Sequence, residues 1–122
     1  MNNNKHVFYS GRLRSIKFAL HGIRFMVKTE PNARIHLAIT ILVIIAGLVS
    51  DLSVTRWLAL VFAIGIVWIT EAVNTALEKL CDYANGKEYN SAIKAIKDVA
   101  AGAVFIAALC SILTGILVFT IK

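Results

Sequence analysis

Three carboxylates and one amide in the middle of the chain have the types and spacing of residues that could do chemistry. They are Glu71, Asn74, Glu78 and Asp82, and on a helix that turns by about 100° per residue they fall within a sector of about 80°. The chain carries no charge between Arg56 and Glu71, so we expect Glu71 inside an apolar zone, with Glu78 and Asp82 at its edge. An ionisable residue inside a membrane is energetically costly and marks a candidate functional site.

Carboxylates beside lysines at a membrane edge suit a divalent cation and a polyphosphate. Mg²⁺ in nucleotide sites binds one or two carboxylates together with phosphate oxygens and keeps several waters. Lys97 could neutralise phosphate charge, while the deeper Glu71 could contact the hydroxyl group of a lipid. Phosphoryl transfer needs mainly alignment and charge neutralisation from the protein. The sequence has no glycine-rich P-loop and no kinase catalytic loop, so the residues alone leave a lipid kinase as one of several options.

The composition indicates an integral membrane protein. Hydrophobic residues make up 58% of the 122 residues, and the mean hydropathy is +0.74, which is too apolar for a soluble domain. We therefore expect one membrane domain over residues 1–122. The net charge of +6 comes without any nucleic-acid-binding motif, so we expect no nucleic-acid partner. Cys81 and Cys110 fit no metal-ligand spacing and are interpreted as small apolar residues.

A surface helix is expected over about residues 11–29. Basic side chains recur every three or four residues along it, at Arg14, Lys17, His21, Arg24 and Lys28. Such a helix is too charged to span a bilayer, but it can lie flat with its basic stripe on headgroup phosphates and its apolar side in the acyl boundary. A second interpretation adds contacts between this stripe and a polyphosphate ligand. Residues 1–10 are polar and are expected to be frayed.

Three membrane helices are expected at about residues 33–50, 57–82 and 94–121. Pro31 suits the first turn of the first membrane helix, and the segment 99–121 is uncharged. If the N-terminus is inside, eleven of the thirteen Lys and Arg residues are cytoplasmic, and only Arg56 and Lys122 are outside. The polar, basic N-terminal residues do not have the pattern of a signal peptide. Three helices are few for a closed site, so we expect a homo-oligomer.

Three motifs in this order resemble the small prokaryotic diacylglycerol kinase and undecaprenol kinase family, from about Arg14 onward. They are Thr29-Glu30-x-Asn32-x-Arg34-Ile-His36, then Glu71-Ala-Val-Asn-Thr-Ala-Leu-Glu78 with Asp82, and Ala95-Ile-Lys97-Asp98-Val-Ala-Ala-Gly-Ala-Val104. The resemblance implies an all-α homotrimer in the prokaryotic cytoplasmic (inner) membrane. It also implies transfer of the γ-phosphate of MgATP to the hydroxyl of a membrane lipid, diacylglycerol or undecaprenol, on the cytoplasmic side. Thr75 and the first motif are closer to the undecaprenol-phosphorylating branch.

The resemblance also implies a role for each matching position. Glu71 matches the general base, and Asn74 matches a polar residue beside the base that contacts the lipid substrate. Glu30 and Glu78 match the two glutamates that bind Mg²⁺. The residues that match nucleotide contacts are Glu78, Glu88, Tyr89, Lys97 and Asp98. Pro31 and Asn90 differ from the residues usual in the family, and these differences affect the expected geometry of the two loops in which they lie.

Two other classes of function compete with this one. A small oligomeric proton-coupled transporter that uses Glu71 as its carrier site would explain a buried acid, but not Glu30, Lys97 and Asp98 at the same face. A non-catalytic scaffold would leave the polar residues with folding roles only. In that case Asn74 would make an interhelical hydrogen bond, and Asp82 and Glu88 would be solvated acids.

Overall fold

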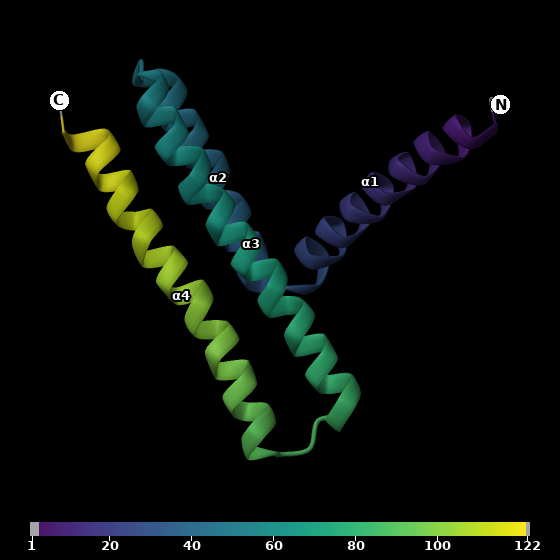
Figure 1. Ribbon diagram of the computed structural model, residues 1–122. Coiled ribbons are helices and arrows are strands. Elements are labelled where there is room, and N and C mark those ends of the chain that lie inside the picture. The colour runs from purple at the N-terminus through teal and green to yellow at the C-terminus, as the bar shows by residue number, and fades with distance from the viewer. Residues whose placement is uncertain (1–2, 122) are drawn as a thin grey trace.

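The computed structural model describes residues 3–121 and contains four helices. They are α1 (Asn3–Thr29), α2 (Pro31–Val49), α3 (Val54–Asn85) and α4 (Ser91–Thr120). Helices α2, α3 and α4 run side by side, with α3 and α4 forming a long hairpin, and α1 leaves this bundle at an angle (Figure 1). The predicted all-helical architecture is thereby confirmed. The single domain was expected over residues 1–122, of which residues 1–2 and 122 lie outside the described part. The predicted position of Lys122 outside the membrane therefore falls on a residue that is not described.

The helix ends differ from the expected ones because local caps set them. Asn90 accepts hydrogen bonds at its side-chain oxygen from the backbone N–H groups of Ala92 and Ile93, at 2.9 and 3.2 Å. This N-cap starts α4 at Ser91 instead of about residue 94. Helix α3 likewise begins after the N-cap Ser53 and continues to Asn85, before Gly86 with φ of 61°. Helix α1 begins at Asn3, so residues 3–10 are helical although fraying was expected there.

Helices α2, α3 and α4 are each long and apolar enough to cross a membrane. Large apolar side chains are exposed along all three, including Leu42 at 66%, Phe62 at 75% and Leu113 at 58%. In water such surfaces would have to be covered, whereas lipid tails match them. The bundle therefore has the architecture of a multi-pass membrane protein.

Among residues 11–29 of α1, the C-terminal part contacts the bundle. Residues 11–25 are exposed, whereas Met26 is buried. A cavity of about 350 Å³ lies between this part of α1 and α3 and is lined by Ile23, Met26, Ala72, Thr75 and Lys79, among others. Helix α1 therefore meets α3 partway along its length, and the α3–α4 hairpin continues beyond this level (Figure 1).

The turn between α1 and α2 is held by Arg34. Its guanidinium donates hydrogen bonds to the carbonyl oxygens of Val27 and Lys28, at 3.1 and 2.6 Å. These carbonyls belong to the last turn of α1, where they have no partner within the helix. Pro31 then occupies the first turn of α2, as predicted.

At the other end of the bundle, Trp57 and Arg56 join the helix ends. The Trp57 indole lies on Gly47, so closely that a Cβ added there would be 2.6 Å from the ring. Arg56 donates hydrogen bonds to the carbonyl oxygens of Val118, at 2.8 Å, and Ile121. A cation at these carbonyls stabilises the C-terminus of α4. The arginine expected outside the membrane thus also has a structural role.

Candidate active site

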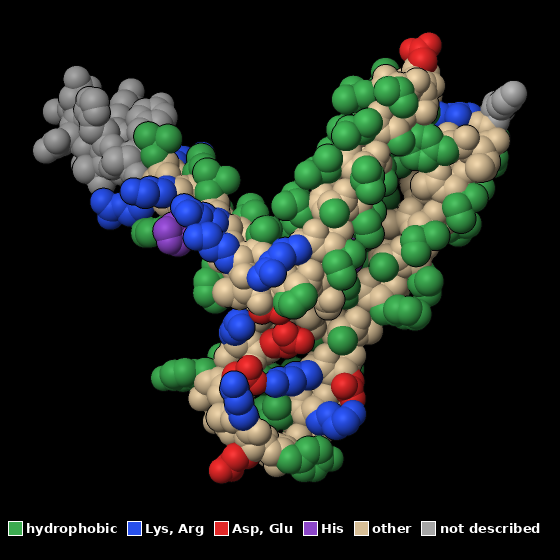
Figure 2. All heavy atoms as spheres, turned by 180° about the vertical axis from the view of Figure 1, so that it is seen from behind, with side chains coloured by type: hydrophobic (Ala, Val, Ile, Leu, Met, Phe, Trp, Pro, Cys, Tyr) green, Lys and Arg blue, Asp and Glu red, His purple; other side chains and the backbone are tan. Residues whose placement is uncertain are grey.

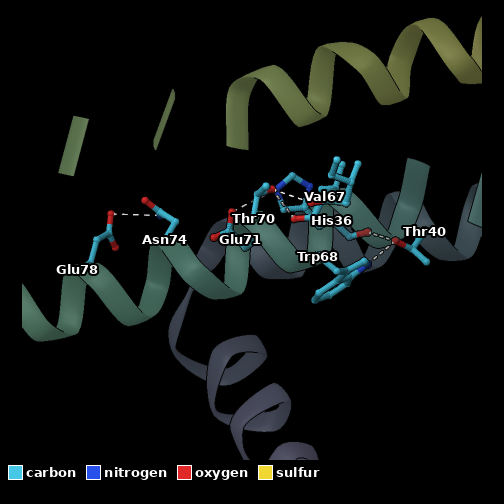
Figure 3. A network of polar contacts seen from close by, with 9 residues as sticks. His36, Thr40, Val67, Trp68, Thr70, Glu71, Asn74 and Glu78 are labelled. Carbon is cyan, nitrogen blue, oxygen red and sulfur yellow. Dashed lines mark hydrogen bonds and ion pairs between the residues drawn. The ribbon is translucent and has the colours of Figure 1, made fainter. Parts of the chain in front are cut away.

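Glu71 is the most enclosed large side chain of the described residues, with a relative exposure of 1%. Its Oε2 lies 3.5 Å from Nε2 of His36 on α2 (Figure 3). Despite this proximity, Oε2 accepts no hydrogen bond with good geometry from the described residues. A buried carboxylate oxygen needs a donor, so this atom points to a ligand, a water or a proton in the working protein.

Asn74 and Glu78 continue the polar face of α3 beyond Glu71. Asn74 Nδ2 donates a long hydrogen bond of 3.5 Å to Glu78 Oε1, and Asn74 Oδ1 is buried and accepts none from the described residues. With Glu71 and His36 they line a cavity of about 310 Å³, closed by Asn32 and Ile35 of α2 and by Ala101, Val104, Phe105 and Ala108 of α4. The predicted common face of Glu71, Asn74 and Glu78 is therefore present.

Glu30 lies at the junction of α1 and α2, where its Oε1 is 3.3 Å from Lys79 Nζ on α3. Glu78 lines the same cavity as Glu71, whereas Glu30 does not line it. Among the described residues no group of three His, Cys, Asp or Glu side chains could hold a metal ion. A Mg²⁺ ion that also binds phosphate oxygens and waters needs only one or two carboxylates, so binding by Glu30 and Glu78 stays a prediction.

Lys97 and Asp98 pair with different partners, although they are neighbours in sequence. Lys97 Nζ lies 2.6 Å from Asp82 Oδ1 and thereby joins α4 to α3. Asp98 Oδ2 lies 2.5 Å from Nζ of Lys94 on its own helix. Acidic and basic side chains gather at this end of the hairpin, whereas apolar side chains cover the other half of the bundle (Figure 2). The contact of Lys97 and Asp98 with a nucleotide stays a prediction.

Glu88 and Tyr89 lie in the loop at the tip of the α3–α4 hairpin (Figure 1). Asn85 Nδ2 donates a hydrogen bond of 2.9 Å to the Glu88 carbonyl, and the Tyr89 side chain is 82% exposed. Neither residue lines the cavity beside Glu71. The structure thus brings Glu71, Asn74 and Glu78 together and leaves the predicted loop contacts at a separate place on the same hairpin.

Sequence reasoning gave no role to His36, Thr40 or Trp68. Trp68 Nε1 donates a hydrogen bond of 2.9 Å to Thr40 Oγ1, which itself donates one of 2.7 Å to the His36 carbonyl oxygen (Figure 3). For His36, its position at the end of the first motif was the sequence feature that could have indicated a role in the site. Both cysteines are free, as expected, with Cys81 buried and Cys110 exposed.

Residues 17–119 match the family of prokaryotic diacylglycerol kinases. The chain belongs to this family. It is 37% identical over 109 residues to the undecaprenol kinase of Bacillus subtilis. This alignment covers 89% of this chain and 88% of that relative. It is 35% identical over 103 residues to the diacylglycerol kinase of a Synechocystis species, covering 84% of this chain and 59% of that longer protein.

Family membership confirms the expected enzyme class, since the protein is a lipid kinase of the diacylglycerol and undecaprenol kinase type. The transporter and scaffold alternatives find no comparable support. The matched segment includes the cavity beside Glu71 and all five of its polar side chains. The geometry of this cavity therefore bears on how the kinase works.

Proposed function

We propose that this lipid kinase transfers the γ-phosphate of MgATP to the hydroxyl of diacylglycerol or undecaprenol at the cytoplasmic face of the prokaryotic inner membrane. The observation that carries the proposal is the enclosed Glu71 carboxylate, which borders a polar cavity between apolar helices. A carboxylate at this position can take up a proton where bulk water has little access. Both Mg²⁺ and ATP are expected from the chemistry of the side chains around it.

The lipid can approach this cavity from the bilayer. A groove of about 530 Å³ between α3 and α4 is lined by apolar side chains such as Val73, Leu77 and Val99, and it shares Asn74 with the cavity. A lipid tail in an apolar groove would leave its hydroxyl near Asn74 and Glu71. Asn74 can donate or accept a hydrogen bond, which suits a hydroxyl group.

In the proposed reaction the lipid hydroxyl oxygen forms the new bond to the γ-phosphorus, and the bond from that phosphorus to the bridging oxygen of ADP breaks. The hydroxyl proton passes to the Glu71 carboxylate. Asn74 orients the hydroxyl beside this carboxylate. ADP then leaves toward the cytoplasm, and the phosphorylated lipid stays in the membrane.

Glu30 and Glu78 would hold the Mg²⁺ ion, which would neutralise phosphate charge when bound. Lys97, held by Asp82, is proposed to supply a further positive charge to the nucleotide. Asp98, Glu88 and Tyr89 would complete the nucleotide site. The loop that carries Glu88 and Tyr89 follows α3, the helix of Glu71 and Glu78, and this succession in one hairpin supports the proposal.

The remaining parts of the proposal concern the membrane and the assembly. Helix α1, with its exposed basic residues, would lie on the cytoplasmic surface of the membrane. Extensive exposed apolar surface on α2, α3 and α4 leaves room for a homotrimer in which neighbouring subunits enclose each site. Native mass spectrometry of the protein in detergent would measure the number of subunits.

The test is the Glu71→Gln variant in an assay with radiolabelled ATP and each lipid in turn. Gln keeps the shape of the side chain but cannot accept a proton, so kcat should fall by ~10²-fold or more. The KM for MgATP should change little, because Glu71 does not contact the nucleotide in this proposal. Asp51→Asn is the matched control, since it makes the same chemical change at the opposite end of the bundle. Near-normal turnover in Glu71→Gln would remove Glu71 from the reaction, and Asp98 would be the next candidate.

A further inference from the structure

Among the described residues, His36 is the one ionisable side chain besides the acids of α3 that lines the Glu71 cavity. Its Nε2 is 3.5 Å from Glu71 Oε2, and the two side chains are 16% and 2% exposed. A buried carboxylate is costly unless a nearby donor or cation compensates for the lost water. His36 is the group from α2 that can do this, because neutral or protonated imidazole can present an N–H at Nε2.

One hydrogen bond joins the part of α2 that carries His36 to α3, and a second one within α2 connects it to the His36 backbone. Trp68 Nε1 donates to Thr40 Oγ1 at 2.9 Å, and Thr40 Oγ1 donates to the His36 carbonyl oxygen at 2.7 Å. Trp68 precedes Glu71 by less than one helical turn. The same turn of α3 therefore carries the carboxylate and sets the position of the imidazole that faces it (Figure 3).

His36 also lines a second cavity, which extends away from the acids. This cavity of about 290 Å³ lies between α2, α3 and α4 and is lined mainly by apolar residues such as Ile39, Val43 and Leu60. The imidazole thus stands where the polar cavity meets an apolar one. A side chain at this boundary can hold Glu71 in one orientation without occupying the polar space that a hydroxyl group needs.

We propose that His36 is a positioning residue for Glu71. The imidazole lies 3.5 Å from Oε2 and would close to a hydrogen bond with it when the lipid hydroxyl binds at Oε1, while the Trp68–Thr40 hydrogen bond keeps the imidazole in place. Fixing one carboxylate oxygen restricts the rotation of the group that receives the proton, and small errors in such alignment are costly for the rate. This inference rests on the proposed role of Glu71 as the base.

Two substitutions at His36 separate positioning from packing. His36→Leu removes the donor, whereas His36→Gln keeps an N–H at nearly the same distance from the backbone. We expect His36→Leu to lower kcat by ~10-fold or more with an unchanged KM for MgATP, and His36→Gln to recover most of this loss. Leu42→Ala, an exposed position on the same helix, is the control and should keep normal kcat. The melting temperature of each variant in detergent is measured alongside.

A double variant tests whether His36 acts through Glu71. In the Glu71→Gln protein, His36→Leu should cause no further loss, because the group that it positions no longer accepts a proton. Losses that add would overturn the inference, as would normal kcat in His36→Leu or failure of His36→Gln to recover activity. If His36→Leu does not fold, Trp68→Phe replaces it, since it removes only the hydrogen bond to Thr40. Normal kcat in Trp68→Phe would then overturn the inference.

The outcomes also separate this inference from the function on which it rests. Full activity of Glu71→Gln would contradict the proposed function itself. An inactive Glu71→Gln protein together with a fully active His36→Leu protein would contradict only the role of His36.

Discussion

Glu30 and Glu78 have the same carboxylate chemistry as Glu71 but a different environment. Both are partly exposed, and each contacts a nitrogen of another side chain, Lys79 for Glu30 and Asn74 for Glu78. Glu71 is enclosed and lacks a well-aligned donor. These environments suit different tasks, because a metal ligand must stay ionised and reach phosphate oxygens, whereas a base must take up a proton.

We predict that Glu78→Gln and Glu30→Gln weaken the dependence on metal rather than the proton transfer. Replacing one hard anionic oxygen by an amide should raise the Mg²⁺ concentration needed for half-maximal activity by ~10-fold. Titration of kinase activity with MgCl₂ at fixed ATP measures this concentration, with Asp51→Asn as the control. An unchanged Mg²⁺ requirement in both variants would contradict the assignment.

The common face of Glu71, Asn74 and Glu78 could be predicted from the sequence because the helical repeat alone determines it. Asp82 belongs to the same face by spacing, yet its carboxylate pairs with Lys97 of α4 and does not line the cavity. The contact between His36 and Glu71 could not be predicted, since it depends on how far α2 is shifted along α3. The hydrogen bond between Trp68 and Thr40 and the packing of Trp57 on Gly47 are two contacts that join α2 to α3 in this position.

The predicted and observed membrane helices differ mainly at their ends. Each predicted membrane helix exists, because long uncharged segments have no alternative in lipid to internal backbone hydrogen bonds. Their limits moved by a few residues because caps such as Asn90 and Ser53 act locally. Arg56 shows that a charge counted for topology can also complete a helix end, here that of α4.

The close contact between α2 and α3 at Gly47 leads to a stability prediction. A methyl group at this position would overlap the Trp57 ring, so Gly47→Ala should lower stability by about 1–3 kcal/mol. Gly65→Ala on α3 is the matched control, because a Cβ there has no neighbour within 4 Å. Thermal unfolding in detergent micelles measures both. Equal melting temperatures for the two variants would contradict the proposed overlap.

The whole molecule separates its charges along the axis of the bundle. Asp51 and Arg56 lie near the end where α2 stops and α3 starts, and the other described charged residues lie on α1 or in the other half of the bundle. Figure 2 shows charged side chains gathered in that other half. Three antiparallel helices produce this separation, which agrees with the topology expected from the basic residues.

We predict that the end with Asp51 faces away from the cytoplasm. In a protein with Cys81→Ala and Cys110→Ala, a membrane-impermeant maleimide added to intact cells should label Ser53→Cys and not Asn85→Cys. Both positions should react after the membrane is opened, which controls for accessibility. Labelling of Asn85→Cys from outside would reverse the topology and make a cytoplasmic nucleotide site impossible.

The enclosure of Glu71 between apolar helices also determines how the concentration of the lipid should be expressed. Glu71 is 1% exposed, and the adjoining groove opens between α3 and α4 along their apolar length. In the proposed mechanism the lipid arrives sideways through a two-dimensional phase, while the nucleotide arrives from water. The rate should then follow the mole fraction of acceptor among the membrane lipids, and the size of the sample volume should have no influence. Diluting the acceptor lipid with an inert phospholipid should therefore lower the reaction rate, whereas suspending the same bilayer in twice the volume of buffer should not.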